Sequence, residues 1–442
     1  MSIFARGVVD SLRRIRWLDL RPSFRTVRKG LLVIMATMGA GAAPSTAYDG
    51  PEWSPFRDAF QVMASNRSHE REFVREWEAN PAKGLPTLSP ANIEATKAAI
   101  KRYANIVKIG GWRALPDVQM QAGTNDPAVA LLRQRLMLSG DLKETALIAE
   151  HFDYALENAV KRFQASNGLP PSGIVDKRTI AALNVPATAR LRQLEVNLGR
   201  LQELTRSTGK RYVVVNIPAA QIEAVENDKV VSRHAGVVGK IDRPTPVLRS
   251  AIHQMNFNPE WILPPTVIEK DLIPKGRELQ RAKQSVLIKY GIDAYDGSGR
   301  KLDPAKLDWN SGQVQGLQYR QQPGKDNPLG FLKINFHNSY SVYMHDTPSE
   351  SLFGRNFRAA SSGCVRVQGI EQLAAWLLAD EGWSLEKIVA MKESGERRDV
   401  RLKRPVPLYF AYITAWATAD GVVQFRRDLY QKDGLGAKAA DY

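Results

Sequence analysis

Apolar residues recur at helical spacing through much of the first half of the chain. In residues 89–110 they lie about one or two helical turns apart, until Gly110-Gly111 ends the run. Residues 126–184 contain three shorter stripes of the same kind, two of which begin at an aspartate. A further amphipathic stretch follows over residues 187–209. These patterns predict helices in all three regions.

The periodicity changes near residue 210. Tyr212 to Ile217 is rich in β-branched residues, and further strand-like stretches separated by turn residues continue to about residue 395. Between residues 275 and 327 this pattern lapses, which favours either a lid over a site or a surface elaboration. Near the end, Asp420-Gly421 indicates a hairpin turn, and residues 430–442 are expected to be a loose tail.

Together these patterns predict an α+β multidomain protein, with helical parts before a mainly β domain that holds an inserted cap. The predicted boundaries are 48–125 for a helical scaffold, 126–186 for a three-helix module, 187–209 for a linker helix, 210–395 for the β domain with its insert at 275–327, and 396–442 for the C-terminal hairpin and tail.

The first 47 residues have the layout of a secretory leader. The first 30 carry eight basic and two acidic side chains, and an uncharged stretch from Leu31 to Ala47 follows and ends in small residues. The apolar part is short for a membrane span, although an uncleaved anchor stays open. We therefore expect residues 1–47 to be a signal peptide or an N-terminal anchor.

The net charge of +16 favours anionic partners or, equally, a soluble basic surface. Export removes nucleic acid as the usual partner of such a chain, and no nucleic-acid-reading motif is present, so we expect no nucleic-acid partner. No phosphate-binding glycine loop occurs, and the histidines lack metal-ligand spacing. We expect neither a metal nor a cofactor.

Cys364 is the only cysteine of the chain. An exported protein usually pairs its thiols or avoids them, so one retained thiol points to a use, the alternative being a buried structural cysteine. His345 lies nineteen positions upstream, and Gly363 precedes the cysteine. A thiol, an imidazole that takes its proton and small neighbours that expose backbone N–H groups are the parts of thiol-based acyl transfer.

The string from Tyr343-Met344-His345-Asp346-Thr347-Pro348 to Ser361-Ser362-Gly363-Cys364-Val365-Arg366 resembles the catalytic signature of the YkuD-type L,D-transpeptidases. It is most similar to the large Gram-negative YcbB-like subgroup. Two positions depart from the wider family, which has a second histidine in place of Ser362 and, in some members, asparagine in place of Arg366. Residues 155–183 resemble the peptidoglycan-binding type 1 module. Such a module would either bind glycan strands or act as a spacer.

The resemblance implies a role for each residue of the signature. Cys364 would be the nucleophile, activated by His345 as a thiolate–imidazolium pair, with the N–H groups of Gly363 and Cys364 as oxyanion donors. Tyr343 would line the site or be a half-buried strand aromatic. Arg366 would hold a substrate carboxylate or pair with a local acid. The remaining two signature residues, Ser361 and Ser362, would orient His345 or cap the following helix.

We therefore expect a periplasmic L,D-transpeptidase that links two diaminopimelate residues of peptidoglycan through a cysteine acyl-enzyme and releases D-alanine. Its partners would be tetrapeptide stems as donor and acceptor, with possible wall synthases, and carbapenem-type β-lactams would acylate the thiol. The alternatives are an L,D-carboxypeptidase, an enzyme that attaches proteins to the wall, and a non-catalytic peptidoglycan-binding scaffold.

Overall fold

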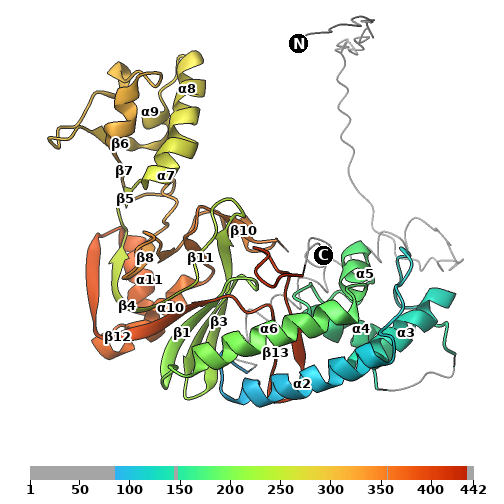
Figure 1. Ribbon diagram of the computed structural model, residues 1–442. Coiled ribbons are helices and arrows are strands. Elements are labelled where there is room, and N and C mark those ends of the chain that lie inside the picture. The colour runs from blue at the N-terminus through green and yellow to red at the C-terminus, as the bar shows by residue number, and fades with distance from the viewer. Residues whose placement is uncertain (1–84, 144–147, 356, 436–442) are drawn as a thin grey trace, which may run out of the picture. The chain divides into compact units, whose positions relative to one another are not determined.

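The computed structural model describes residues 85–143, 148–355 and 357–435 (Figure 1). The expected leader over residues 1–47 and the first half of the expected scaffold lie outside these ranges. Among the described helices, none has the length and apolar character needed to cross a membrane. The fold divides into a helical part, a closed β-sheet, an inserted subdomain and a C-terminal segment.

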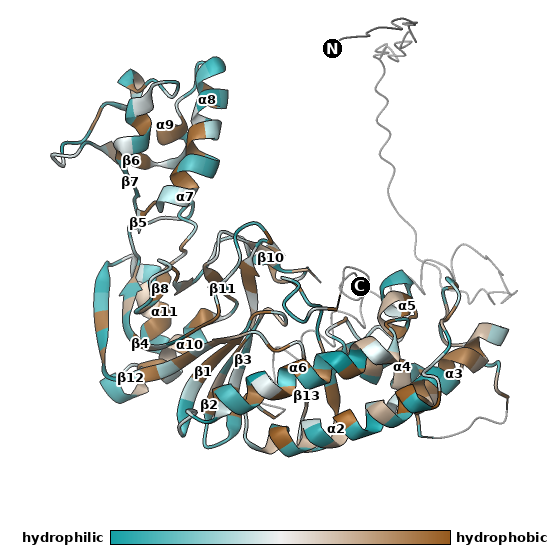
Figure 2. Cartoon of the chain, in the orientation of Figure 1, coloured by the Kyte–Doolittle hydropathy of each residue, from teal (hydrophilic) through white to brown (hydrophobic). Residues whose placement is uncertain are grey.

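Within the residues that the structure describes, the helical part has five α-helices. They are α2 (Ala91–Lys108), α3 (Pro127–Ser139), α4 (Tyr154–Ser166), α5 (Lys177–Leu183) and α6 (Ala187–Thr205). An aspartate caps each helix of the three-helix module, since the side chains of Asp126, Asp153 and Asp176 accept hydrogen bonds from backbone N–H groups in the first turns of α3, α4 and α5. Figure 2 shows hydrophobic and hydrophilic residues side by side along α2 and α6, as expected of helices with one buried side.

The main sheet has nine strands in the order β10-β3-β11-β9-β8-β4-β12-β1-β2, and a further pairing of β2 with β3 closes it. Its strands are β1 (Arg211–Asn216), β2 (Gln221–Glu226), β3 (Lys229–Gly239), β4 (Leu248–Phe257), β8 (Leu332–Phe336), β9 (Met344–His345), β10 (Ala359–Ser361), β11 (Val365–Val367) and β12 (Arg398–Ala411). Because β12 pairs with both β4 and β1, residues 398–411 belong to this sheet, and the expected hairpin begins only at residue 415.

The core of this domain lies between the sheet and two helices, α10 (Ile370–Leu377) and α11 (Leu385–Ser394). Leu373 and Leu377 of α10 and Ile388 of α11 pack with the inward-facing residues of the strands. Full burial of such a side chain contributes about 1.5–3 kcal/mol to stability. The short strands that carry the signature residues are therefore held on a well-packed support.

The insert forms a subdomain with its own core. It contains β5 (Trp261–Ile262), α7 (Pro265–Val267), a π-helical turn (Ile268–Leu272), α8 (Ile273–Arg281), α9 (Val286–Tyr290), β6 (Ile292–Tyr295) and β7 (Gln318–Gln321). A Cβ atom on Gly276 would lie 2.2 Å from the ring of Trp309, so the packing of α8 on this ring requires glycine. The insert thus begins near Trp261, earlier than the expected residue 275.

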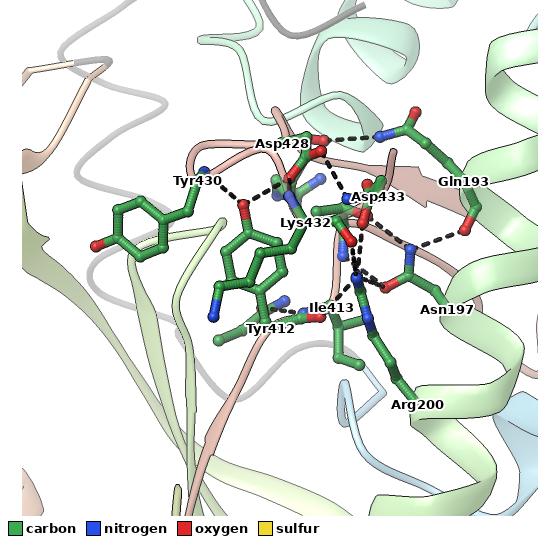
Figure 3. Close-up of polar contacts among 12 residues, drawn as sticks. Gln193, Asn197, Arg200, Tyr412, Ile413, Asp428, Tyr430, Lys432 and Asp433 are labelled. Atoms are coloured by element: carbon green, nitrogen blue, oxygen red, sulfur yellow. Dashed lines mark hydrogen bonds and ion pairs between the residues drawn. The ribbon is translucent and has the colours of Figure 1, made fainter. Parts of the chain in front are cut away.

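The C-terminal segment is packed. After the hairpin of β13 (Ala415–Ala417) and β14 (Val423–Phe425), the carboxylate of Asp428 accepts hydrogen bonds from the Tyr412 hydroxyl and from the backbone N–H groups of Lys432 and Asp433 (Figure 3). Asp433 forms an ion pair of 2.6 Å with Arg200 of α6. Residues 428–433 are therefore anchored by a buried polar network, which corrects the expectation of a loose tail from residue 430.

Candidate active site

His345 is the last residue of β9, and Cys364 directly precedes the neighbouring strand β11. In the parallel pairing of β11 with β9, Arg366 is opposite His345, and the N–H of Val365 donates to the carbonyl of Tyr343. Side chains two positions apart on a strand share a face. Cys364, Tyr343, His345 and Arg366 are therefore gathered on one face, as the spacing of the signature requires.

The thiol of Cys364 is half-buried and lies against Tyr343. Burial raises the pKa of the thiol, and this effect is opposed by hydrogen bonds from the backbone and the hydroxyl of Tyr343 and by the charges of Lys333 and Arg366. The ring of Tyr343 packs edge-on against His345, with 5.6 Å between ring centroids. Tyr343 thus contacts both members of the expected catalytic pair.

The imidazole of His345 is buried, with 5% of the residue exposed. Its Nδ1 lies 2.5 Å from the carbonyl oxygen of Asp346. A carbonyl only accepts hydrogen bonds, so Nδ1 carries the proton and Nε2 is left as the base. Burial, reinforced by the charge of Arg366, lowers the pKa of His345 to about 3, although the backbone carbonyls of Asp346 and Pro328 act in the opposite direction.

Burial therefore opposes charge on both groups, and it disfavours the expected thiolate–imidazolium pair when no substrate is bound. Among the hydrogen bonds of the described residues, none joins the Cys364 sulfur to His345. Proton transfer between them requires that the two groups come within hydrogen-bond distance.

The loop before Cys364 is fixed by Ser361. The Ser361 hydroxyl donates to the carbonyl of Cys364 at 2.6 Å and accepts from the N–H of Gly363 at 3.2 Å. The N–H of Gly363 is thus already bonded, which corrects its expected role as an oxyanion donor. The hydrogen bonds of the described residues include none from the N–H of Cys364, so this group is the remaining donor.

Gly363 is required for its backbone conformation. Its φ is +111°, which is unfavourable for residues with a side chain. A Cβ atom at this position would meet its nearest neighbours at 3.6 Å, an ordinary contact distance. The requirement for glycine at this position therefore comes from φ and not from a lack of space.

Ser362 is exposed and takes part in a link to the inserted subdomain. Its hydroxyl accepts a hydrogen bond of 2.9 Å from Arg243, which also forms an ion pair of 2.6 Å with Asp271 of the π-helical turn. Neither Ser361 nor Ser362 has a hydrogen bond to His345, and α10 begins after Gly369. The two serines hold the loop instead of orienting the imidazole or capping the helix.

Two further residues of the site were not predicted from the sequence. Trp261 of β5 donates its indole hydrogen to the Tyr343 hydroxyl at 3.0 Å. Lys333 of β8 is paired with His345 across the sheet and places its Nζ 4.5 Å from the centroid of the Tyr343 ring. Neither residue belongs to a local motif, so only strand pairing and the fold of the insert bring them to the site.

The C-terminal segment supports the same loop from behind. The hydroxyl of Thr245 donates to the carbonyl of Gly363 at 2.9 Å and accepts from the N–H of Gly239 at 2.8 Å. The Tyr430 hydroxyl in turn accepts from the N–H of Thr245 at 3.1 Å and donates to the carbonyl of Gly239 at 2.7 Å. The backbone N–H of Tyr430 is bonded to Tyr412, a member of the network in Figure 3.

The other histidines of the described residues lie away from this face or have structural partners. His234 is buried between the Ser232 hydroxyl and the Gln368 carbonyl, and His253 stacks on His337 with 4.1 Å between ring centroids. Within the described ranges, no group of three metal-ligating side chains comes together. The chemistry available at the site is that of a thiol, an imidazole and hydrogen-bond donors.

Comparison with known proteins identifies two parts of the chain. Residues 210–401 match the family model described as "L,D-transpeptidase catalytic domain", and residues 125–183 match the one described as "Putative peptidoglycan binding domain". A "Putative L,D-transpeptidase" of Haemophilus influenzae is 32% identical over 222 residues, a match that covers 50% of this chain and 44% of the relative. The match thus spans less than half the length of this curated relative.

Solved structures of L,D-transpeptidases are also similar to parts of the chain. One from Xylanimonas cellulosilytica is 18% identical, with 66% of this chain and 96% of that chain covered and a TM-score of 0.22. L,D-transpeptidase 3 from Mycobacterium tuberculosis, in complex with a faropenem-derived adduct, is 11% identical, with 45% and 60% covered and a TM-score of 0.21.

Proposed function

We propose that this chain cross-links two diaminopimelate residues of peptidoglycan through an acyl-enzyme on Cys364, and the match of residues 210–401 to the L,D-transpeptidase catalytic domain supports this. The observation that carries this proposal is the placement of Cys364, Tyr343 and His345 on one face of two paired strands. The basic leader and the single thiol support a periplasmic location, with anchoring in the inner membrane if the leader is retained.

The first half of the reaction releases D-alanine. As the sulfur of Cys364 attacks the carbonyl of the L-centre of a tetrapeptide stem, its proton passes to Nε2 of His345. The tetrahedral intermediate then breaks its carbon–nitrogen bond, and the imidazolium gives that proton to the departing amine. A thioester remains on Cys364, and D-alanine leaves as a neutral amine before it equilibrates with solvent.

The second half transfers the acyl group. The side-chain amine of an acceptor stem attacks the thioester, and its proton passes to His345. The carbon–sulfur bond breaks, and Cys364 recovers a proton from the imidazolium. The hydrogen bond from Nδ1 to the Asp346 carbonyl keeps Nε2 available for both transfers and stabilises the imidazolium that forms between them.

The oxyanion of each tetrahedral intermediate is stabilised by the N–H of Cys364. One such donor lowers the barrier by about 2.7–4 kcal/mol. The loop keeps this N–H in place, because Ser361 binds the carbonyl of Cys364 and Thr245 binds that of Gly363. The proposed route needs charge on the sulfur and the imidazole only during the reaction, so it is compatible with burial that opposes charge on both groups.

The inserted subdomain and the helical module supply the contacts to the substrate away from the reacting bond. The insert touches the site through Trp261 and through the ion pair of Arg243 with Asp271, so it is suited to cap the donor stem. The matched peptidoglycan-binding domain supports glycan binding by residues 125–183. The proposal that wall synthases are partners of this chain follows from the proposed reaction alone.

Analysis of muropeptides tests this function. The purified protein and the Cys364→Ala variant are incubated with peptidoglycan rich in tetrapeptide stems, with and without an added amine acceptor. We expect links between diaminopimelate residues, together with D-alanine release, from the parent protein only. Tripeptides without cross-links would identify an L,D-carboxypeptidase, and the same cross-links from the variant would refute the nucleophile.

A further inference from the structure

Two cations flank His345 on the reacting face of the sheet. In the strand order β11-β9-β8, Arg366 is the direct partner of His345 on one side and Lys333 on the other. Directly paired residues of neighbouring strands point to the same side of a sheet. The row Arg366–His345–Lys333 therefore places a guanidinium and an ammonium on either side of the imidazole.

Lys333 has no carboxylate partner within the described part of the chain. Its ammonium lies over the ring of Tyr343 instead, at 4.5 Å from the centroid. Burial lowers the pKa of Lys333, while Cys364 and Asp399 act in the opposite direction. Asp399 is beyond ion-pair distance, and its carboxylate is bonded to Asn256 at 2.6 Å.

Arg366 is in the same situation. Its Nη1 donates to the Thr347 hydroxyl at 3.3 Å, its Nε is buried without a hydrogen-bond partner, and no acid of the described residues pairs with it. The expected alternative of a local acid is thus absent from the described residues. Half-buried cations are costly unless an anion or a set of acceptors compensates them. Within the described residues the sulfur of Cys364 acts on both cations, and a carboxylate of the substrate would compensate them further.

We infer that Lys333 and Arg366 together bind the terminal carboxylate of the donor stem, one on each side of His345. This inference rests on the proposed function and names which group of the substrate the site recognises. In a tetrapeptide donor, a single carbon separates this carboxylate from the nitrogen that leaves. His345 protonates that nitrogen, so the carboxylate lies beside the imidazole, where the two cations are.

The same arrangement defines which donors are accepted. A stem that continues beyond its fourth residue, or ends in a carboxamide, has no negative charge at this position and leaves both cations uncompensated. A charged hydrogen-bond partner typically changes affinity by about tenfold or more. The pair therefore selects stems that end directly after the residue to be released.

Binding to the full chain with Cys364→Ala separates this inference from catalysis. Two synthetic tetrapeptides are titrated by calorimetry, one ending in the D-alanine carboxylate and the other in D-alaninamide. We expect the carboxylate to bind at least about tenfold more tightly, and we expect Lys333→Met or Arg366→Gln to reduce this preference to about threefold or less. Lys333→Arg keeps the charge and restores most of the preference.

Lys392→Met is the matched control. Lys392 also lies over an aromatic ring, that of Phe331 at 5.0 Å, but it is paired with Glu371 at 2.6 Å. Its loss leaves the carboxylate preference unchanged, and thermal unfolding verifies that each variant is folded. The inference is overturned if Lys333→Met prefers the carboxylate peptide as strongly as the Cys364→Ala parent does, or if this parent shows no preference. In either case, transpeptidation by the unmodified protein would still support the proposed function.

Discussion

The indole nitrogen of Trp261 lies 3.0 Å from the hydroxyl of Tyr343, and this hydrogen bond joins the inserted subdomain to the residue beside Cys364. The Tyr343 hydroxyl also interacts with the thiol of Cys364. Tyr343 is therefore held between the first strand of the insert and the reacting sulfur. A change at Trp261 should reach the nucleophile without altering any residue of the catalytic motif.

Trp261→Phe should slow acylation of Cys364 by a carbapenem-type β-lactam. The variant loses one hydrogen bond, worth about 0.5–1.5 kcal/mol, so we expect a rate roughly threefold to tenfold lower. Tyr343→Phe removes the acceptor of the same hydrogen bond and also the hydroxyl group near the sulfur of Cys364. We therefore expect a larger decrease in the acylation rate. The double variant should be no slower than Tyr343→Phe; additive losses would show that the two residues act separately.

Tyr430→Phe should also slow the acylation of Cys364, although Tyr430 acts on Cys364 only through Thr245 and Gly363. The variant removes the hydroxyl that ties Thr245 and Gly239 together behind the carbonyl of Gly363. A small displacement of a reacting group slows a reaction strongly, so we expect the rate of acylation to be about tenfold lower.

Tyr409→Phe is the control for this prediction, because the Tyr409 hydroxyl is bonded to the Ser207 carbonyl, a site that the catalytic loop does not use. Both variants should lose about 1 kcal/mol of stability in chemical denaturation. Only Tyr430→Phe should lose reactivity. Equal acylation rates for the two variants would assign Tyr430 a structural role alone.

Alkylation of Cys364 by iodoacetamide should rise with pH and reach its midpoint above 8.5, the ordinary value for a thiol. Burial raises the pKa of Cys364 and favours the neutral form. Lys333→Met removes a cation that stabilises the thiolate, so its midpoint should lie higher still. A midpoint below 8.5 in the parent protein would indicate a resting thiolate–imidazolium pair.

His234 should make the fold sensitive to acid. Burial lowers the pKa of His234 to about 4 from an ordinary value of 6.5. Below pH 6.5 the unfolded chain binds a proton that the folded chain excludes, so the free energy of unfolding falls as the pH drops toward 4. The expected loss from this group is about 3 kcal/mol.

Urea unfolding of the parent protein and His234→Gln at pH 7 and pH 4 measures this contribution. Glutamine retains hydrogen-bonding groups but does not titrate in this range. The loss of stability between the two pH values should be about 3 kcal/mol smaller in the variant. An identical loss in both proteins would mean that His234 is protonated in the folded state.

Local patterns were sufficient for the helical module and for the location of the reacting groups. The aspartate caps at Asp126 and Asp176 and the β-branched run before Ile217 depend on neighbours in the sequence, and the helices and strands there agree with the expectation. The signature from Tyr343 to Arg366 likewise indicated which residues share one face of the sheet, because strand geometry places alternate residues on one face.

Features that depend on pairing between distant segments could not be predicted from the sequence. Lys333 enters the site only because β8 pairs with β9, and Tyr430 reaches Thr245 across 185 positions of sequence. The N–H of Gly363 was misassigned because the hydroxyl of Ser361 turns back to bind it. The effect of burial on the pKa of His345 could not be predicted either, since the burial of this residue follows from the fold and not from its neighbours in the chain.

The most direct test of Cys364 as the nucleophile is the intact mass of the protein after treatment with a carbapenem-type β-lactam, followed by peptide mapping. We predict a single adduct on the peptide that contains Cys364 and no adduct on the folded Cys364→Ala variant. An adduct that persists in this variant, or a folded parent protein that stays unmodified, would contradict the account.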